Sequence, residues 1–195
     1  MAVLMRGAGE WARLFYRGAL YGLLGVLFCN ASSSSAAAPS EYRVKAVFLF
    51  NFTQFVEWPP GVFKSPEAPF VIGILGNDPF GAEIDSVVRG ETVGQRPLVI
   101  ERYHAVTDVR DCNILYIGRT QIGHLPEILA ALAGRSILTV SDSDTADQRG
   151  VMIRLLTQSN RIRMQIDVGA AKRGNLTISS KLLRPAEIVG GAGEG

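Results

Sequence analysis

The chain has 195 residues, of which 47% are hydrophobic and 19% are charged, and its formal net charge is +2. This near balance of charges argues against nucleic acid as a partner, since phosphate-binding proteins carry a clear basic excess. The hydrophobic content excludes a disordered chain, and the presence of only two cysteines excludes a disulfide-dense scaffold. The length suits one domain, or one domain preceded by a removable segment.

Residues 1–38 have the pattern of a secretory signal peptide. Met1–Arg17 carries three arginines against one glutamate, and the uncharged apolar run Ala19–Cys29 follows it. This run of 11 residues is shorter than the roughly 20 that a membrane-spanning helix needs. A small, polar stretch then leads to a cleavage site that we predict after Ala37 or Ala38. An uncleaved N-terminal anchor is the alternative. Lipid attachment at the cysteine that ends the run is disfavoured by the bulky residue before it.

Removal of this leader would leave a chain over residues 39–195 with no net charge and a single cysteine, Cys112. One cysteine cannot form an intrachain disulfide, although an exported protein meets an oxidising compartment. The remaining sequence has no apolar run of membrane-spanning length and is long enough to bury one substantial core. We therefore expect an exported, soluble protein.

The first half of this chain alternates helical and strand patterns. Ser40–Trp58 repeats apolar residues at helical spacing behind an N-capping serine, and a pair of prolines stops the helix. Phe70–Leu75 is a short apolar run rich in β-branched residues, which favours a buried strand. The next predicted elements are a helix over Phe80–Val88 and strands over Pro97–Tyr103 and Cys112–Ile117.

The second half continues the alternation and adds a hairpin. In chain order, the predicted elements are a helix over Ile122–Ala133, a strand over Ser136–Val140, a hairpin of Val151–Leu156 and Ile162–Val168, a helical turn over Ala170–Arg173, an extended stretch over Leu176–Ile178, a last helix over Ser179–Ile188 and a disordered tail over Gly190–Gly195. Short apolar strands that alternate with helices indicate an α/β protein. We predict a single-domain α/β sandwich over residues 39–189, with a largely parallel central sheet and an antiparallel hairpin at one edge.

Two loops contain residues that bind ligands in other proteins, but neither has the required spacing. Gly73–Gly81 joins a strand to a helix, yet it matches neither of the glycine patterns that cradle phosphate. We interpret it as a tight connection to a capped helix. Asp142, Asp144 and Asp147 share one loop and suggest calcium, but their alternation is broken and no distal glutamate follows. A solvated loop is the favoured interpretation, and we predict no metal site.

The residues most often used in catalysis are few and scattered. His104 follows a strand and His124 lies near a helix start, and surface exposure is the default expectation for both. Cys112 opens an apolar strand, where a buried and inert thiol is expected, because a nucleophile needs an activating base and partial exposure. A pair of acid–base carboxylates stays open, although nothing singles one out. The aromatic residues of the Ser40–Trp58 helix should mostly enter the core, with a dimer or partner surface as the alternative.

The ordered set of segments is more informative than any single motif. EYRVKAVFLFNFTQFVEWP resembles the opening helix of the YfiR family of periplasmic regulators, and PFVIGILGNDPFG resembles its first strand and turn. CNILYIG, SILTVSD, GVMIRLL and MQIDVGAAKRGNLTISSKLLRPAEIV follow in that family's order. The resemblance covers residues 41–189, which is nearly all of the chain after the leader.

This resemblance implies a non-enzymatic periplasmic repressor without a cofactor. YfiR binds the periplasmic sensor domain of YfiN, an inner-membrane diguanylate cyclase, and holds the enzyme off, which lowers cyclic di-GMP and biofilm formation. Two departures stand out in this sequence. The best-known relative is controlled through disulfides, whereas Cys112 has no partner in the mature chain. The loop Ser143–Gly150 lacks the phenylalanine and the glycine pair that relatives usually carry.

A partner surface is expected at the carboxyl edge of the sheet, because open α/β sheets bind ligands outside the carboxyl ends of their strands. The residues that this topology brings to the edge are Asn77, Asp78, Phe80, Arg119, Ser141 and Asp142. A homodimer is the expectation from the frequency of symmetric dimers. The alternative function is a periplasmic small-molecule-binding sensor subunit for a histidine kinase or an outer-membrane transporter. An enzyme, such as a carboxylate hydrolase, is disfavoured by the missing motifs.

Overall fold

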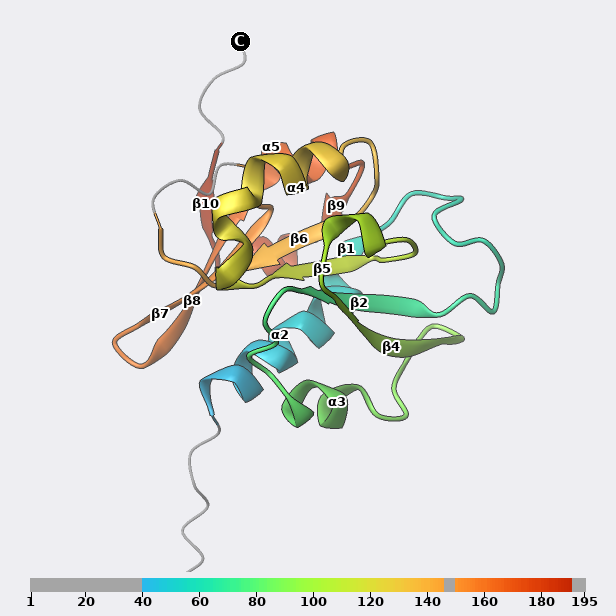
Figure 1. Cartoon of the computed structure of the whole chain (residues 1–195), viewed down its shortest axis with the longest axis horizontal. Coiled ribbons are helices and arrows are strands. Elements are labelled where there is room, and N and C mark those ends of the chain that lie inside the picture. Colours follow the sequence, from blue (N-terminus) through green and yellow to red (C-terminus); the bar gives the residue numbers. More distant parts are fainter. Residues whose placement is uncertain (1–39, 146–149, 191–195) are drawn as a thin grey trace, which may run out of the picture. The chain divides into compact units, whose positions relative to one another are not determined.

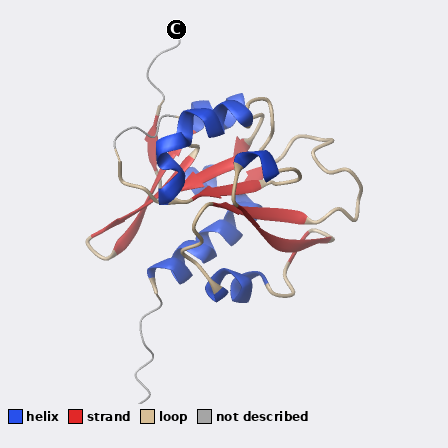
Figure 2. Ribbon diagram, in the orientation of Figure 1, coloured by secondary structure: helices blue, strands red, loops and turns tan. Residues whose placement is uncertain are grey.

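The computed structural model describes residues 40–145 and 150–190. The predicted leader, residues 1–38, lies outside the described residues, as does the predicted tail beyond residue 190. The described part has the predicted α/β fold, with an eight-stranded, mostly parallel sheet between helices and a second sheet of two short strands (Figures 1 and 2). None of the described helices is long and apolar enough to cross a membrane.

The large sheet is built from strands that lie far apart in the sequence. Its members are β2 Phe70–Leu75, β3 Thr92–Val93, β4 Arg96–Tyr103, β5 Ile114–Ile117, β6 Leu138–Ser141, β7 Ile153–Gln158, β8 Arg161–Asp167 and β10 Glu187–Val189. They are arranged in the order β10-β8-β7-β6-β5-β2-β4-β3. The strands from β7 through β6, β5 and β2 to β4 run parallel, and β7 and β8 form the predicted antiparallel hairpin. β10 pairs in parallel with β8, so the hairpin lies one strand inside the outer edge.

Helices cover both faces of this sheet. α2 Glu41–Phe55 and α3 Ala82–Val88 lie on one face, beneath the sheet in Figure 1. α4 Leu125–Ala131 covers the other face together with the short 3-10 turns η1 Val106–Asp108 and η2 Arg119–His124. Two further short helices, α5 Val168–Arg173 and α6 Ser180–Leu183, follow the hairpin.

Two hydrophobic clusters form because successive strand residues point to opposite faces. On β5, Ile114 and Tyr116 enter the cluster beneath α2 and α3, whereas Leu115 and Ile117 enter the cluster beneath α4. The same sheet therefore carries a buried core on each face, and its central strands are apolar along their whole length, as parallel strands usually are.

α2 begins where the sequence predicts but ends earlier. The side chain of Ser40 accepts a hydrogen bond from the backbone N–H of Arg43, which confirms its role as N-cap. The helix stops at Phe55, before the prolines, because Val56–Glu57 forms β1 and pairs with β9, Thr177–Ile178. This pairing joins the start of the domain to its end.

The remaining elements show where the local sequence was enough to predict the bounds of a helix or strand. β2 has the predicted bounds, and the predicted hairpin turns at Ser159 and Asn160, which adopt positive φ values of 48° and 59°. The helix predicted over Ile122–Ala133 is shorter, since η2 occupies its first turn. The last helix, predicted over Ser179–Ile188, is wrong in its second half. It ends at Leu183, before a proline, and the chain then pairs with β8 as β10.

Candidate functional site

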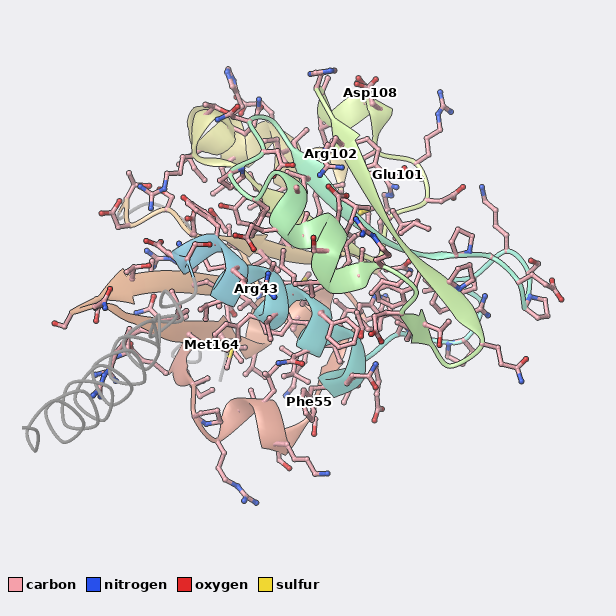
Figure 3. All side chains as sticks on the ribbon, turned by 90° about the horizontal axis from the view of Figure 1, so that it is seen from below. Arg43, Phe55, Glu101, Arg102, Asp108 and Met164 are labelled. Carbon is pink, nitrogen blue, oxygen red and sulfur yellow. The ribbon has the colours of Figure 1, made fainter. Side chains whose placement is uncertain are left out.

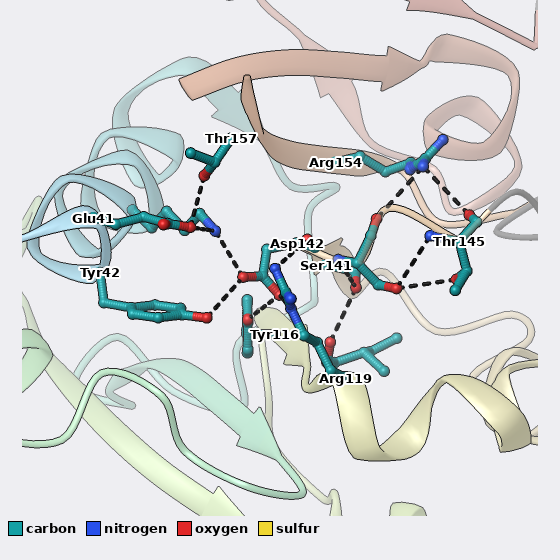
Figure 4. A network of polar contacts seen from close by, with 12 residues as sticks. Glu41, Tyr42, Tyr116, Arg119, Ser141, Asp142, Thr145, Arg154 and Thr157 are labelled. Atoms are coloured by element: carbon teal, nitrogen blue, oxygen red, sulfur yellow. Dashed lines mark hydrogen bonds and ion pairs between the residues drawn. The ribbon is translucent and has the colours of Figure 1, made fainter. Parts of the chain in front are cut away.

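The carboxylate of Asp142, directly after β6, is the centre of a buried polar network (Figure 4). It accepts hydrogen bonds from Lys45 Nζ at 2.7 Å, from the Tyr116 hydroxyl at 2.6 Å and from the Tyr42 hydroxyl at 3.2 Å. Arg119 Nε lies 3.4 Å away on the solvent side. Asp142 itself is only 1% exposed, so its charge depends on these donors instead of water.

Lys45 brings a full positive charge into the core from α2. It lies on the face of the helix that also buries Ala46, Leu49 and Phe52, and its side chain is fully buried. A buried ammonium needs acceptors for its charge and its donors. Asp142 supplies one of them, and Glu41, one turn earlier on α2, supplies another at 2.5 Å.

Glu41 connects the buried network to the protein surface and to β7. Its Oε1 accepts a hydrogen bond from the hydroxyl of Thr157 on β7 at 2.6 Å, and its side chain is 38% exposed. The start of α2 is therefore held to the ends of β5, β6 and β7 by one continuous set of contacts. These contacts span 97 residues between Lys45 and Asp142, and 116 between Glu41 and Thr157.

The network controls the protonation of its members. Burial by itself would raise the pKa of the Asp142 carboxyl, but hydrogen bonds from Lys45 and Tyr116 and the charges of Lys45 and Arg119 outweigh it and hold the pKa below its ordinary value. Hydrogen bonds from Lys45 and Thr157 lower the pKa of Glu41. Burial, reinforced by the neighbouring Asp142 carboxylate, raises the pKa of Tyr116 and of Tyr42. The network is thus a fixed array of ionised acids, a lysine and two neutral phenols.

Aromatic rings pack around the network and restrict its geometry. Phe80, which is buried, makes edge-to-face contacts with Tyr116 at 4.7 Å and with Tyr42 at 5.6 Å between ring centroids. Lys45 Nζ lies 4.9 Å from the centre of the Tyr42 ring. Because the rings are in contact with each other, both hydroxyl groups are held toward Asp142.

Arg119 is the exposed part of this site. It begins η2 directly after β5, its side chain is 58% exposed, and Asp142 holds its Nε. The Asp142 charge raises the pKa of the guanidinium, so it stays protonated. Its Nε faces the buried carboxylate, and one terminal nitrogen donates to the carbonyl of Asp142 at 3.4 Å. The side chain is still largely exposed, which is an arrangement suited to binding an anionic group.

A second polar group lies beside it, at the loop between β2 and α3. Asp78 Oδ1 accepts hydrogen bonds from the N–H groups of Phe80 and Gly81, which precede α3, so the loop is the predicted tight connection. The expected cap is wrong, because Gly81 is the N-cap of α3 and no side chain accepts a capping hydrogen bond there. Its Oδ2 accepts from Arg102 at 2.7 Å, and Arg102 also binds Asp85 of α3 at 2.8 Å. Arg102 extends from β4 toward the start of α3 (Figure 3).

The six residues predicted for this edge come together, but in two layers. Asn77 and Arg119 are exposed and Asp78 is partly so, whereas Phe80, Ser141 and Asp142 are buried. The Ser141 hydroxyl donates to the carbonyl of Ile117 and joins β6 to β5. The prediction of a solvated loop is wrong for Asp142, because Lys45 and Tyr116 enclose it, and Asp147 lies outside the described residues.

Sequence reasoning missed five members of the network, which are Glu41, Tyr42, Lys45, Tyr116 and Thr157. For Lys45 a signal was present, since it shares helical spacing with Leu49 and Phe52, and a lysine on an apolar helix face needs a buried acid. Nothing in the sequence identified Asp142 as that acid, because the pairing depends on how the strands are ordered in the sheet.

The other candidate residues have the following positions. Cys112 is buried, as predicted, donates to the carbonyl of Ile114 and has its pKa raised by burial to about 12. His104 and His124 are exposed, as expected. Within residues 40–145 and 150–190, no group of three or more histidine, cysteine or acidic side chains could hold a metal ion. The network itself lacks an activated nucleophile and is suited to recognition.

Comparisons with known proteins bear on this arrangement. A search of proteins with curated functions found no match. A family model described as YfiR/HmsC-like matches residues 42–187, from the second residue of α2 to the first residue of β10. The match includes every member of the Asp142 network except Glu41. Because this match covers most of the chain, the chain belongs to the YfiR/HmsC-like family.

Proposed function

We propose that this protein is a non-enzymatic periplasmic regulator that binds the periplasmic sensor domain of an inner-membrane diguanylate cyclase and represses it. Repression lowers cyclic di-GMP and, with it, biofilm formation. Family membership supports a partner of this type. In this proposal the leader over residues 1–38 directs export, residues 39–189 form the regulatory domain, no cofactor is needed, and the working unit is a homodimer.

The observation that carries the proposal is the exposed Arg119 guanidinium, fixed from below by the buried Asp142. An arginine held in one orientation loses less side-chain entropy when it binds a carboxylate on a partner. Asn77 and Glu41 are exposed on the same edge and would make the neighbouring polar contacts. Phe80, Ser141 and Asp142 are buried, so in this proposal they position the contact surface instead of touching the partner.

Repression follows if the protein binds the inactive conformation of the cyclase more tightly than the active one. Shifting a cyclase from almost fully active to almost fully inactive requires a preference of about 10⁴-fold. A rigid surface favours such a preference, because a flexible one would adapt to both conformations. The Asp142 network provides that rigidity by joining α2, β5, β6 and β7 behind the surface.

The test is genetic and biochemical. Deletion of the gene in its host should raise cellular cyclic di-GMP, and the wild-type gene should restore the original concentration. Arg119→Glu should fail to restore it while reaching the periplasm in normal amounts. Arg184→Glu is the matched control, since Arg184 is an exposed arginine directly after α6 and should leave repression intact.

Capture of the tagged protein from solubilised membranes identifies the partner. A diguanylate cyclase with a periplasmic domain that is retained by wild type and lost with Arg119→Glu would support the proposal. A histidine kinase or a transporter retained in its place would favour the alternative function, a small-molecule-binding sensor subunit. An unchanged cyclic di-GMP concentration after deletion would contradict the proposed repression.

A further inference from the structure

A cavity of about 560 Å³ lies at the opposite end of the sheet from Asp142, where β2, β5 and β6 begin. The loop between β1 and β2, cyan in Figure 1, forms one wall, and the residues that precede β5 and β6 form the other. Its volume falls in the range that binds small organic molecules. None of the six residues assigned to the partner surface lines it, so it is a separate site.

The wall formed by the loop is held in place. Arg96 stacks on the ring of Phe63 at 3.8 Å and donates hydrogen bonds to the carbonyls of Ser65 and Ala68 at 2.6 and 2.9 Å. Phe63 also packs against Phe70 at the start of β2, with 6.1 Å between the ring centroids. The cavity is therefore formed before any ligand enters, which reduces the entropy lost on binding.

Its polar groups leave donors available. Asn113 is 5% exposed, and its Oδ1 accepts from the N–H of Val71 at 2.9 Å. Among the described residues, no acceptor is bound to its Nδ2 group. Arg110, which also lines the cavity, makes neither a side-chain hydrogen bond nor an ion pair in the described part of the chain.

The other charged groups that line the cavity already have hydrogen-bond partners. Lys64 binds Asp111 at 2.5 Å, and Glu101 accepts from the Tyr103 hydroxyl at 2.6 Å. The guanidinium of Arg135 donates to the backbone carbonyls of Val109 and Arg110. Three basic side chains (Lys64, Arg110 and Arg135) and two acidic ones (Glu101 and Asp111) line the cavity, so its lining carries one net positive charge, and the guanidinium without a partner within residues 40–145 and 150–190 is that of Arg110. An amide donor and a guanidinium that are both without a protein partner among the described residues, in one cavity of net positive charge, select an anionic acceptor.

We propose that this cavity binds a small organic anion, with its acidic group toward Asn113 and Arg110. The apolar body of the ligand would lie against Val62, Phe63 and Pro69, which form the hydrophobic part of the lining. The fixed loop sets the shape of this part, and the two donors set the orientation of the ligand. This site is independent of the proposed repression, because it uses other residues at the other end of the strands.

The test uses two fluorescent probes that share the same fused rings. Anilinonaphthalene sulfonate carries an anionic group, and N-phenylnaphthylamine lacks it. Both would be titrated into protein purified after expression of the full-length sequence. We expect the anionic probe to bind at least about tenfold more tightly, since a charge-assisted contact distinguishes the two.

Three variants locate the site. Arg110→Gln should weaken the anionic probe about tenfold and leave the neutral probe unchanged. Val62→Trp should weaken both, because it fills the cavity. Arg89→Gln, an exposed arginine at the end of α3 that does not line the cavity, should change neither. Circular dichroism and the urea midpoint confirm that each variant is folded.

Two outcomes would overturn the inference. Equal affinity of wild type for both probes would show that the site does not select an anion. Equal weakening by Arg110→Gln and Arg89→Gln would show that the anionic probe responds only to overall charge.

Discussion

The ammonium of Lys45 on α2 lies 2.7 Å from the carboxylate of Asp142 after β6, and both side chains are completely shielded from solvent. A buried pair of this kind is a weak source of net stability, because both charges lose their hydration. Removal of one partner alone is strongly destabilising, since it leaves the other charge buried and uncompensated. Lys45→Met should therefore destabilise the fold by about 3–5 kcal/mol, measured by urea unfolding at neutral pH.

The double variant Lys45→Met with Asp142→Leu is the control for that prediction. It removes both charges and should recover a large part of the stability that Lys45→Met loses. The difference between the double variant and the sum of the two single variants is the coupling energy of the pair. If the double variant lost as much as the sum of the two single variants, the two residues would not act as a pair.

The stability of the protein should fall in acid because of Asp142. Its folded-state pKa lies below the ordinary value of 3.8, so its contribution is present above about pH 4 and is lost as pH falls through the folded-state pKa. Glu41, whose pKa is also lowered, adds to this loss in the same direction. Urea unfolding at a series of pH values should show that the free energy of unfolding falls more steeply in acid for wild type than for Asp142→Asn. Parallel curves would exclude Asp142 as the group responsible.

The two tyrosines of the network should differ in their contribution. Tyr116 is fully buried and donates to Asp142 at 2.6 Å, whereas Tyr42 is partly exposed and donates at 3.2 Å. Tyr116→Phe should cost about 1–3 kcal/mol, since it deprives a buried carboxylate of a donor. Tyr42→Phe should cost less, because water can replace its hydroxyl. Urea midpoints of the two variants, measured side by side, provide the comparison, and a larger loss for Tyr42→Phe would contradict it.

Gly73 in the middle of β2 should tolerate no side chain. A Cβ atom there would lie 2.5 Å from Cε2 of Tyr103 and 2.8 Å from Sγ of Cys112. Gly73→Ala should therefore lower the free energy of unfolding by about 1–3 kcal/mol, through overpacking. Gly123→Ala is the matched control, because a Cβ there meets nothing within 4 Å, and its stability should be unchanged or slightly higher. Differential scanning calorimetry distinguishes the two.

The thiol of Cys112 should be unreactive in the folded protein. Burial removes it from solvent and raises its pKa to about 12, so the thiolate is nearly absent at neutral pH. Ellman's reagent should react with it slowly in buffer and rapidly in concentrated urea. Rapid reaction in buffer would contradict the buried position of the side chain.

The sequence predicted the fold better than the site, for a physical reason. β2 and the β7–β8 hairpin follow from local patterns, namely an unbroken apolar run and two residues that adopt positive φ in the turn. β10 was mistaken for the end of a helix, because its strand conformation depends on pairing with β8. Local preference is overridden where a neighbouring strand supplies the hydrogen bonds.

The partner edge was predicted from topology, but its internal organisation was not. Strand order brought Arg119 and Asp142 to one edge, as expected for the carboxyl ends of parallel strands. The burial of Asp142 depends on Lys45, which lies near the start of α2, far from Asp142 in the sequence. No periodicity within either segment encodes that contact, so only the three-dimensional arrangement could identify it.

The pairing of β1 with β9 has a consequence for how the chain folds. The first helix of the domain is completed by residues at its far end, since Lys45 needs Asp142 and Val56 pairs with Ile178. Contacts between such distant residues form slowly, because a long loop must close before they contribute. Until the segment that holds Asp142 and the segment that holds Ile178 have been synthesised, α2 and β1 lack these contacts. A chain with this order of contacts should complete its fold only once nearly all of its residues are available.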